Sequence, residues 1–333
     1  ILAEQHYLNF RRILDPLGIP VTLRTAARQE GTPEADGTLP ELFSESAPQG
    51  PPLVVGTHAV LFEKTTFENL GLVVIDEQHK FGVLQRSRLI ARADAPDVLV
   101  MTATPIPRTI TQTLYGDLDV SILKAPPAGR GKILTALRDI SKLPDIIAFI
   151  RTETAAGRQA YIVYPLIEES EKLVAKAASA EYEKWRELLA PATVGLVHGR
   201  LDAESKDAVM RDFRSGQNSV LVATTVIEVG VDVPNATLMI IEAAERFGLA
   251  QLHQLRGRIG RGGNKGYCIL LSDGKNPEGM EKLKVLEGTG DGFEIAEVDM
   301  KIRGPGDIEG TQQSGIGFDL KIANLGKDGD ILQ

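Results

Sequence analysis

The chain has 333 residues, of which 43% are hydrophobic and 25% are charged, a composition typical of a globular protein with about two domains. No apolar run approaches the roughly 20 residues that span a bilayer, so no membrane partner is expected. The net charge of −8 leaves no basic footprint and counts against nucleic-acid binding through charge alone. The single cysteine excludes a disulfide framework and fits a reducing cytosol. The chain starts at Ile1 without a signal peptide, which indicates a segment of a longer protein.

Short apolar runs rich in β-branched residues predict strands. In chain order, these runs cover residues 21–24, 52–55, 71–75, 98–101, 160–164, 192–197, 220–223, 238–242 and 266–271. Amphipathic stretches between the runs predict helices over residues 145–154, 181–190 and 203–215. Because several runs are apolar at consecutive positions, as strands covered on both faces are, the alternation predicts α/β domains with parallel sheets.

Two stretches rich in glycine and proline divide the chain. Residues 31–52 also carry serines and acids, and predict a long, mobile surface loop. Residues 125–132, APPAGRGK, predict a linker between two α/β blocks. A charged helix is expected over residues 277–286, before a glycine-studded tail. The expected organisation is a first domain over residues 1–124, the linker, a second domain over residues 133–275 and a last segment over residues 276–333.

Two adjacent acids follow the predicted strand at residues 71–75. In an open parallel sheet, ligands bind beyond the carboxyl ends of the strands, and Asp76 and Glu77 fall at that edge. Asp76 can hold Mg²⁺, largely through water, and Glu77 can orient or deprotonate an attacking water. A polar loop is the alternative for a bare acid pair. Gln78 and His79 follow, and TATPIPRT comes one strand later, which favours the catalytic interpretation.

A glycine-broken basic stretch, QLRGRIGR, predicts a phosphate site in the second block. It places Arg256, Arg258 and Arg261 after an expected helix start. A guanidinium at a domain boundary can neutralise charge on a transferring phosphoryl group. A solvated basic turn is the alternative, although the full pattern from Gln254 to Arg261 is much rarer than a basic turn.

The stretch VATTVIEVGVDVPN ends a predicted strand in two threonines. Thr224 and Thr225 offer hydroxyls that suit a phosphate backbone, and Asp232, close to Gly230, suits a ribose or an arginine partner. Taken alone, this segment also fits an ordinary loop after a strand.

These motifs, in this order, resemble those of superfamily 2 helicases. The matching stretches are DEQH at residues 76–79, TATPIPRT at 102–109, VHGRL at 197–201, TTVIEVGVDVPNA from residue 224 and QLRGRIGRG from residue 254. The stretch IRGPGDIEGTQQSG, residues 302–315, narrows the resemblance to RecG helicases, which share a translocation motif there with the transcription-repair coupling factor Mfd. Pro305, the GTQQSG ending and DEQH favour RecG, and an Mfd-like translocase is the alternative among motors.

The resemblance implies two RecA-like parallel-sheet domains, the first incomplete, followed by a helical hairpin and the translocation motif. It implies an enzyme that uses ATP and Mg²⁺ to translocate on double-stranded DNA, and that remodels replication forks and Holliday junctions in recombination and repair. Branched double-stranded DNA and single-stranded DNA-binding protein are the implied partners, and a monomer is the implied state.

The matching motifs also assign roles to individual residues. The motifs assign catalysis to Asp76, Glu77, Arg258 and Arg261, with Asp76 as the metal ligand. ATP binding adds Gln78, His79, Gly230, Asp232 and Gln254. DNA contacts fall to Gly56, Thr57, His58, His198, Gly199, Thr224 and Thr225. Coupling of ATP hydrolysis to movement falls to Thr102, Thr104, Lys282, Arg303 and Gln313.

One motif of such motors does not occur in the 333 residues. This is the Gly-x-x-x-x-Gly-Lys-Ser/Thr loop, whose backbone amides cradle phosphates. The wedge domain with which RecG relatives engage branched DNA is missing from the sequence as well. This chain alone is therefore expected to hydrolyse no ATP, and a non-catalytic DNA- or protein-binding module is a second alternative.

Other conspicuous side chains have ordinary interpretations. A lone histidine after a strand, such as His58 or His198, is more often structural than catalytic, although both loops lie on the DNA-facing side in the family that the chain resembles. Trp185 is expected as a surface anchor in a charged helix. The histidines and Cys268 lack metal-ligand spacing, so no zinc is expected.

Overall fold

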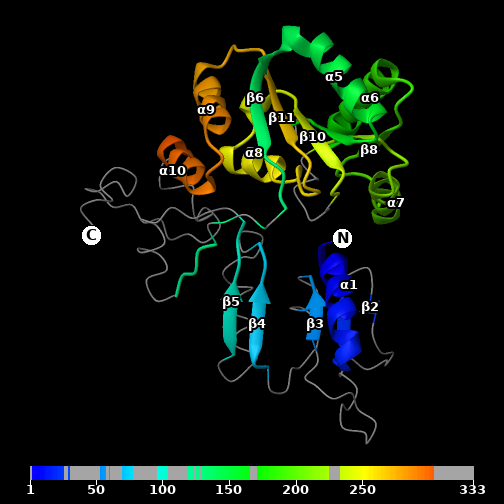
Figure 1. The fold of residues 1–333 in the computed structure, drawn as a ribbon, viewed down its shortest axis with the longest axis vertical. Helices are drawn as coiled ribbons and strands as arrows, with labels where there is room; N and C mark the ends of the chain where they lie inside the picture. The colour runs from blue at the N-terminus through cyan, green and yellow to red at the C-terminus, as the bar shows by residue number, and fades with distance from the viewer. Residues whose placement is uncertain are drawn as a thin grey trace, which may run out of the picture. The chain divides into compact units, whose positions relative to one another are not determined.

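The computed structural model describes residues 2–25, 29–30, 53–57, 60, 70–77, 96–103, 119–123, 125, 127, 129–165, 171–224 and 233–303. They belong to two compact units, Ile1–Ala103 and Thr104–Gln333, each with its own parallel strands (Figure 1). None of the helices in these ranges is long and apolar enough to cross a membrane. The loop expected over residues 31–52 lies outside the described residues.

The first unit begins with a helix that packs on short strands. Its elements are α1 (Leu2–Leu14), η1 (Asp15–Leu17), β1 (Val21–Arg24), β2 (Gln29–Glu30), β3 (Leu53–Gly56), β4 (Leu72–Ile75) and β5 (Asp97–Val100). β1 pairs in parallel with β3 and antiparallel with β2, and β4 pairs in parallel with β5. Val21 and Leu23 are buried together with Tyr7 of α1, because alternate side chains of a strand point to one face.

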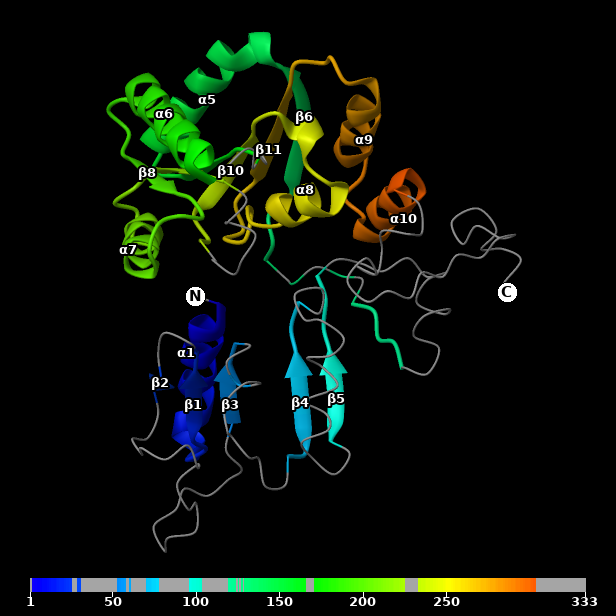
Figure 2. The ribbon, with the colours of Figure 1, turned by 180° about the vertical axis from the view of Figure 1, so that it is seen from behind.

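The second unit is a parallel sheet between two layers of helices (Figure 1 and Figure 2). Its strands are β6 (Ile133–Asp139), β7 (Gln159–Val163), β8 (Val194–Val197), β9 (Val220–Ala223), β10 (Ala236–Ile241) and β11 (Gly266–Ser272). They lie in the order β6-β11-β10-β7-β9-β8, and every neighbouring pair is parallel. Its helices are η3 (Ile140–Lys142), α5 (Leu143–Ala155), α6 (Glu171–Leu189), α7 (Ala203–Arg214), η5 (Ala244–Arg246), α8 (Leu249–Arg256), α9 (Pro277–Gly288) and α10 (Gly292–Arg303).

Successive residues of these strands are buried on opposite faces of the sheet. On one face, Ile162 of β7 lies in a core cluster with Ile150 of α5 and Trp185 of α6. On the other face, the adjacent Tyr161 packs against Phe213 of α7, with 4.9 Å between ring centroids. Helices α8, α9 and α10 contribute to this second cluster as well (Figure 2). Burial on both faces explains why the inner strands of this sheet are mostly apolar in the sequence.

The expected parallel-sheet α/β fold is confirmed, although the structure holds elements that the sequence analysis did not predict, among them α1, β2 and β6. The runs at residues 21–24 and 220–223 coincide with β1 and β9, and the other predicted strands shift by one or two residues. β6 was not predicted, because it is an edge strand with mixed burial, in which polar residues interrupt the apolar pattern. The helix expected over residues 181–190 is only the second half of α6, which begins at Glu171.

The expectation that Trp185 is a surface anchor is wrong. Its side chain is 0% exposed, and its indole N–H donates to the hydroxyl of Tyr164 at 2.6 Å. That hydroxyl donates in turn to Oε2 of Glu181 at 2.8 Å. Trp185 lies one helical turn from the buried Leu189, so one face of α6 packs on the sheet, whereas Glu183, Lys184 and Arg186 are exposed.

Candidate functional site

The acid pair follows β4 directly, as the sequence predicts. Ile75, the last residue of β4, pairs in parallel register with Val100 of β5. Since the carboxyl ends of parallel strands meet at one edge, Asp76 and Thr102 lie at the same edge of this sheet. Thr102 is exposed there. The structure therefore brings together two residues that the motifs assign to metal binding and to coupling.

One oxygen of the Asp76 carboxylate accepts a hydrogen bond, and the other lies near a histidine. Oδ1 accepts the backbone N–H of Glu77 at 2.9 Å, and Oδ2 lies 3.5 Å from Nε2 of His6 on α1. Glu77 has φ 55°, a left-handed conformation that is uncommon for glutamate and is often found at functional sites. Sequence reasoning missed His6, because only the fold brings α1 next to the end of β4.

The donor set at this edge fits Mg²⁺. The carboxylates of Asp76 and Glu77 and the hydroxyl of Thr102 are hard oxygen donors, which Mg²⁺ prefers. The Asp76 side chain is 37% exposed, so water can reach it. The described part of the chain holds no group of three or more His, Cys, Asp or Glu residues that could bind a metal by itself. An ion held here would take its remaining ligands from water and substrate, as Mg²⁺ does.

A second group of candidate residues lies in the loop of residues 257–264, which follows α8 and is called the arginine loop below. It crosses the amino ends of β10 and β11: the N–H of Gly260 donates to the carbonyl of Ala236 at 3.2 Å, and Gly266 begins β11. Ile259 is fully buried between the half-buried Arg258 and the exposed Arg261. A core residue therefore anchors the loop between the two arginines that the motif assigns to catalysis.

The arginine loop also contacts the end of the TTVIEVGVDVPN stretch. A Cβ on Gly262 would collide with the carbonyl of Pro234, so the two backbones are in direct contact. Asp232, which the motifs assign to ATP binding, precedes Pro234 by two positions and lies outside the described residues. Gln254 lies on α8, one turn before the loop, and is half-buried.

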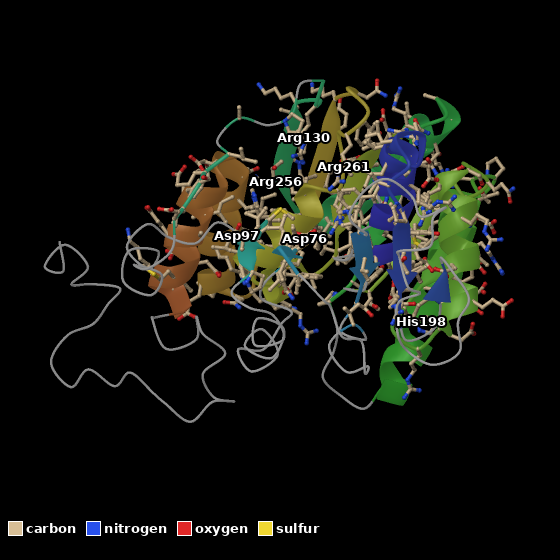
Figure 3. All side chains as sticks on the ribbon, turned by 90° about the horizontal axis from the view of Figure 1, so that it is seen from below. Asp76, Asp97, Arg130, His198, Arg256 and Arg261 are labelled. Carbon is tan, nitrogen blue, oxygen red and sulfur yellow. The ribbon has the colours of Figure 1, made fainter. Side chains whose placement is uncertain are left out.

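Arg256, the first arginine of the motif, has a structural position. It is 6% exposed, and its Nη1 donates to the carbonyls of Leu286 at 2.9 Å and Thr289 at 2.7 Å, at the end of α9. Its Nη2 lies 2.9 Å from Nδ1 of His253. Burial, and then the charge of Arg256, lower the pKa of His253 to about 4. Figure 3 shows Arg256 close to Arg130 and Arg261, which belong to the same unit.

Residues assigned to DNA contact lie at the opposite ends of the strands, beyond β8 and β9. The N–H of Thr224 donates to the carbonyl of Val197 at 3.3 Å, which places it beside His198. Thr224 is 3% exposed, and its hydroxyl oxygen has no hydrogen-bond partner within the described ranges. Nδ1 of His198 accepts the N–H of Arg200 at 3.3 Å.

Two cationic side chains lie near His198. Burial first, and then the charges of Lys206 and Arg200, lower the pKa of His198. Nζ of Lys206 donates to the carbonyl of Gly199 at 2.8 Å. Sequence reasoning did not single out Lys206, although its position in the first turns of the helix after VHGRL is a usable signal. An unpaired hydroxyl beside two cations suits an anion such as a phosphate.

In the first unit, the expected DNA contact Gly56 is the last residue of β3, and Thr57 follows it. The N–H of Thr57 donates to the carbonyl of Arg24 at 3.2 Å, and a Cβ on Gly56 would collide with Val60. In the second unit, Nζ of Lys282 on α9 donates to the carbonyls of Glu245 at 2.8 Å and Phe247 at 2.6 Å.

The remaining expected site residues cannot be placed. Outside the described residues lie His58, Gln78, His79, Thr104, Thr225, Gly230, Asp232 and Gln313, together with the side chain of Arg303.

Three family models match the chain in order. They are DEAD/DEAH box helicase over residues 1–113, Helicase conserved C-terminal domain over residues 139–263, and ATP-dependent DNA helicase RecG, domain 3, C-terminal over residues 289–333. With the parallel-sheet fold, they define the class of protein as a helicase motor with RecA-like domains.

Relatives narrow this class. The chain is 48% identical over 333 residues to an ATP-dependent DNA helicase RecG of Synechocystis, covering 100% of this chain and 39% of the relative. It is 48% identical over 336 residues to the protein of that name from Escherichia coli O157:H7, covering 98% of this chain and 47% of the relative. A solved structure of RecG bound to a three-way DNA junction is 41% identical, with a TM-score of 0.71, and the match covers 99% of this chain and 42% of that one.

The chain belongs to the RecG helicase family. It spans less than half of the length of these relatives.

Proposed function

We propose that this chain is the motor segment of an ATP-dependent helicase that translocates on double-stranded DNA and remodels forks and Holliday junctions in recombination and repair. The observation that carries the proposal is the position of Asp76 and Glu77 directly after a parallel strand, in a chain 48% identical to ATP-dependent helicases. The relative solved on a three-way DNA junction supports branched DNA as the substrate. Single-stranded DNA-binding protein as a partner, and a monomeric state, rest on the family resemblance.

In this proposal, Asp76 and Glu77 divide the chemistry of ATP hydrolysis. Asp76 would hold Mg²⁺, and the Glu77 N–H that its Oδ1 accepts fixes the orientation of its carboxylate, with His6 close to the other oxygen. Bound Mg²⁺ neutralises charge on the terminal phosphates. Glu77 accepts a proton from the attacking water. Arg258 and Arg261 stabilise negative charge on the transferring phosphoryl group, as arginine fingers do.

Other residues bind DNA and transmit movement. His198, Gly199 and Thr224 contact a DNA phosphate at the carboxyl ends of β8 and β9, where the Thr224 hydroxyl has no hydrogen-bond partner among the described residues. Lys282 holds α9 on the segment that follows β10, so that α9 moves together with the second sheet. Two donated bonds to backbone carbonyls make this a fixed attachment rather than a sliding contact.

A single substitution in the full-length protein tests the proposal. Glu77→Gln keeps the shape of the side chain and removes the proton acceptor, so it should abolish ATP turnover stimulated by forked DNA while nucleotide binding persists. Glu187→Gln, which neutralises an exposed acid on α6, is the matched control and should leave turnover unchanged. Turnover by the Glu77 variant at the wild-type rate would contradict the assignment.

A further inference from the structure

The short helix η5 places an arginine at the carboxyl edge of the second sheet. η5 follows the end of β10, and its last residue, Arg246, is exposed. Because the strands are parallel, this is the edge at which His198 and Thr224 follow β8 and β9. Neighbouring strands lie about 4.8 Å apart, so the ends of β10 and β9, with β7 between them, are roughly 10 Å apart. A DNA strand carries one phosphate per about 3.4 Å of helix axis, so one backbone can reach both positions.

The backbone on both sides of Arg246 is held by α9. Nζ of Lys282 donates to the carbonyl of Glu245 at 2.8 Å and to that of Phe247 at 2.6 Å, the residues before and after Arg246. A Cβ on Gly279 of α9 would collide with Cβ of Glu245, so α9 and η5 are in direct contact. Arg246 therefore extends from a fixed backbone, which reduces the freedom that is lost when it binds a ligand.

The turn from β10 into η5 has a rarely adopted conformation. Ala243 has φ 46°, in the left-handed region that an alanine seldom enters. Residues in such regions persist where the surrounding packing enforces them, and they are frequent at functional sites. Ala244, which follows, is 0% exposed, so packing enforces this turn. The result is that Arg246, rather than Ala244, faces solvent at the edge of the sheet.

The charge of Arg246 is not neutralised within the described ranges, where its side chain makes no hydrogen bond and no ion pair. The nearest acids in the sequence do not pair with it. Oε2 of Glu245 is buried without a hydrogen-bond partner there, and Glu242 is 8% exposed and lies near Lys184 of α6. An exposed guanidinium on a fixed backbone suits a phosphate, whose oxygens accept its N–H groups.

We propose that Arg246 binds a phosphate of the DNA backbone, and that Lys282 holds the turn that presents it. The proposal rests on the proposed function, because it extends the DNA-binding edge of His198 and Thr224. Lys282 is a positioning residue in this scheme, since its ammonium group is bonded to the carbonyls beside Arg246. A nucleotide phosphate offers the same chemistry, and the experiment separates the two sources.

Variants of the full-length protein test both roles. Arg246→Gln removes the charge, and Arg246→Lys keeps it without the planar fork. Arg214→Gln is the matched control, because Arg214 is an exposed arginine at the end of α7, the helix that leads from the carboxyl end of β8 back to the start of β9. Lys282→Met is made alone and together with Arg246→Gln. Each protein is titrated with forked DNA at several salt concentrations without nucleotide, and with a non-hydrolysable ATP analogue without DNA.

Loss of one charged hydrogen bond predicts that Arg246→Gln binds forked DNA roughly 10-fold more weakly. The slope of log affinity against log salt should become shallower by about 0.9, the value for one phosphate contact on duplex DNA. Arg246→Lys should keep the wild-type slope, and the Arg214 control and all analogue affinities should be unchanged. Lys282→Met should weaken DNA binding in the wild-type background and add little to Arg246→Gln.

Wild-type DNA affinity and salt slope in Arg246→Gln would overturn the proposal. Weakened analogue binding with unchanged DNA binding would overturn it as well, since Arg246 would then contact nucleotide. Fully additive effects of Lys282→Met and Arg246→Gln would refute the positioning role of Lys282. If the wild-type protein does not bind forked DNA, the proposed function itself fails.

Discussion

Replacing Arg256 by methionine tests how the end of α9 is held on the second unit. Methionine keeps most of the apolar stem of the buried side chain and removes every donor. The carbonyls of Leu286 and Thr289 then lose their partner, as does Nδ1 of His253. Because α9 leads into α10, this contact determines where the last helices of the described chain are attached.

The burial of the two carbonyls determines how much stability Arg256→Met should cost. A buried carbonyl left without a partner costs about 1–3 kcal/mol. The bond to Leu286 is buried and the bond to Thr289 is only partly buried, so water can satisfy the second carbonyl in part. We expect Arg256→Met to lower the free energy of unfolding of the second unit by about 2–4 kcal/mol.

Fluorescence of the single tryptophan of the chain can measure this change in the free energy of unfolding. Trp185 is fully buried in the second unit, on the opposite face of the sheet from α8 and α9, so its fluorescence reports unfolding of that unit in urea. Arg151→Met is the matched control, because Arg151 also donates two bonds to a helix-end carbonyl, that of Leu188, but in an exposed position. If both variants shift the urea midpoint equally and slightly, the buried contacts of Arg256 do not stabilise the fold, and the reasoning is refuted.

Two further predictions concern the groups around the arginine loop. The folded protein holds the pKa of His253 at about 4, below its ordinary 6.5, so only the unfolded chain takes up the proton between these values. The free energy of unfolding should therefore fall as the pH drops from 6.5 towards 4, by up to about 1.4 kcal/mol per pH unit, and His253→Gln should flatten that slope in the Trp185 assay. Equal slopes in the two proteins would contradict this account. In the full-length protein, Arg261→Ala should slow DNA-stimulated ATP turnover by roughly 10³-fold, whereas Arg214→Ala, an exposed arginine at the end of α7, should not. A loss of only a few-fold would remove Arg261 from the catalytic set.

The sequence by itself determined the parallel-sheet core and the order of the motifs. Strand β9 is buried on both faces and consists of apolar residues only, so the apolar run shows its position and length. Asp76 and Glu77 were placed at a strand end because an apolar run that stops at two acids marks the edge of a sheet.

Contacts between distant residues were decided by the tertiary structure. Trp185 was misplaced because the charges of α6 are visible in the sequence, whereas the single face that packs on the sheet depends on how the helix is rotated. The motif could not separate Arg256 from Arg261, since three arginines in one stretch look alike until α9 covers the first of them. The approach of His6 to Asp76, and of Arg130 to Arg261, joins residues far apart in the chain. No local pattern encodes these pairs, because the packing of α1 on its sheet, and of the segment before β6 on the arginine loop, sets their distances.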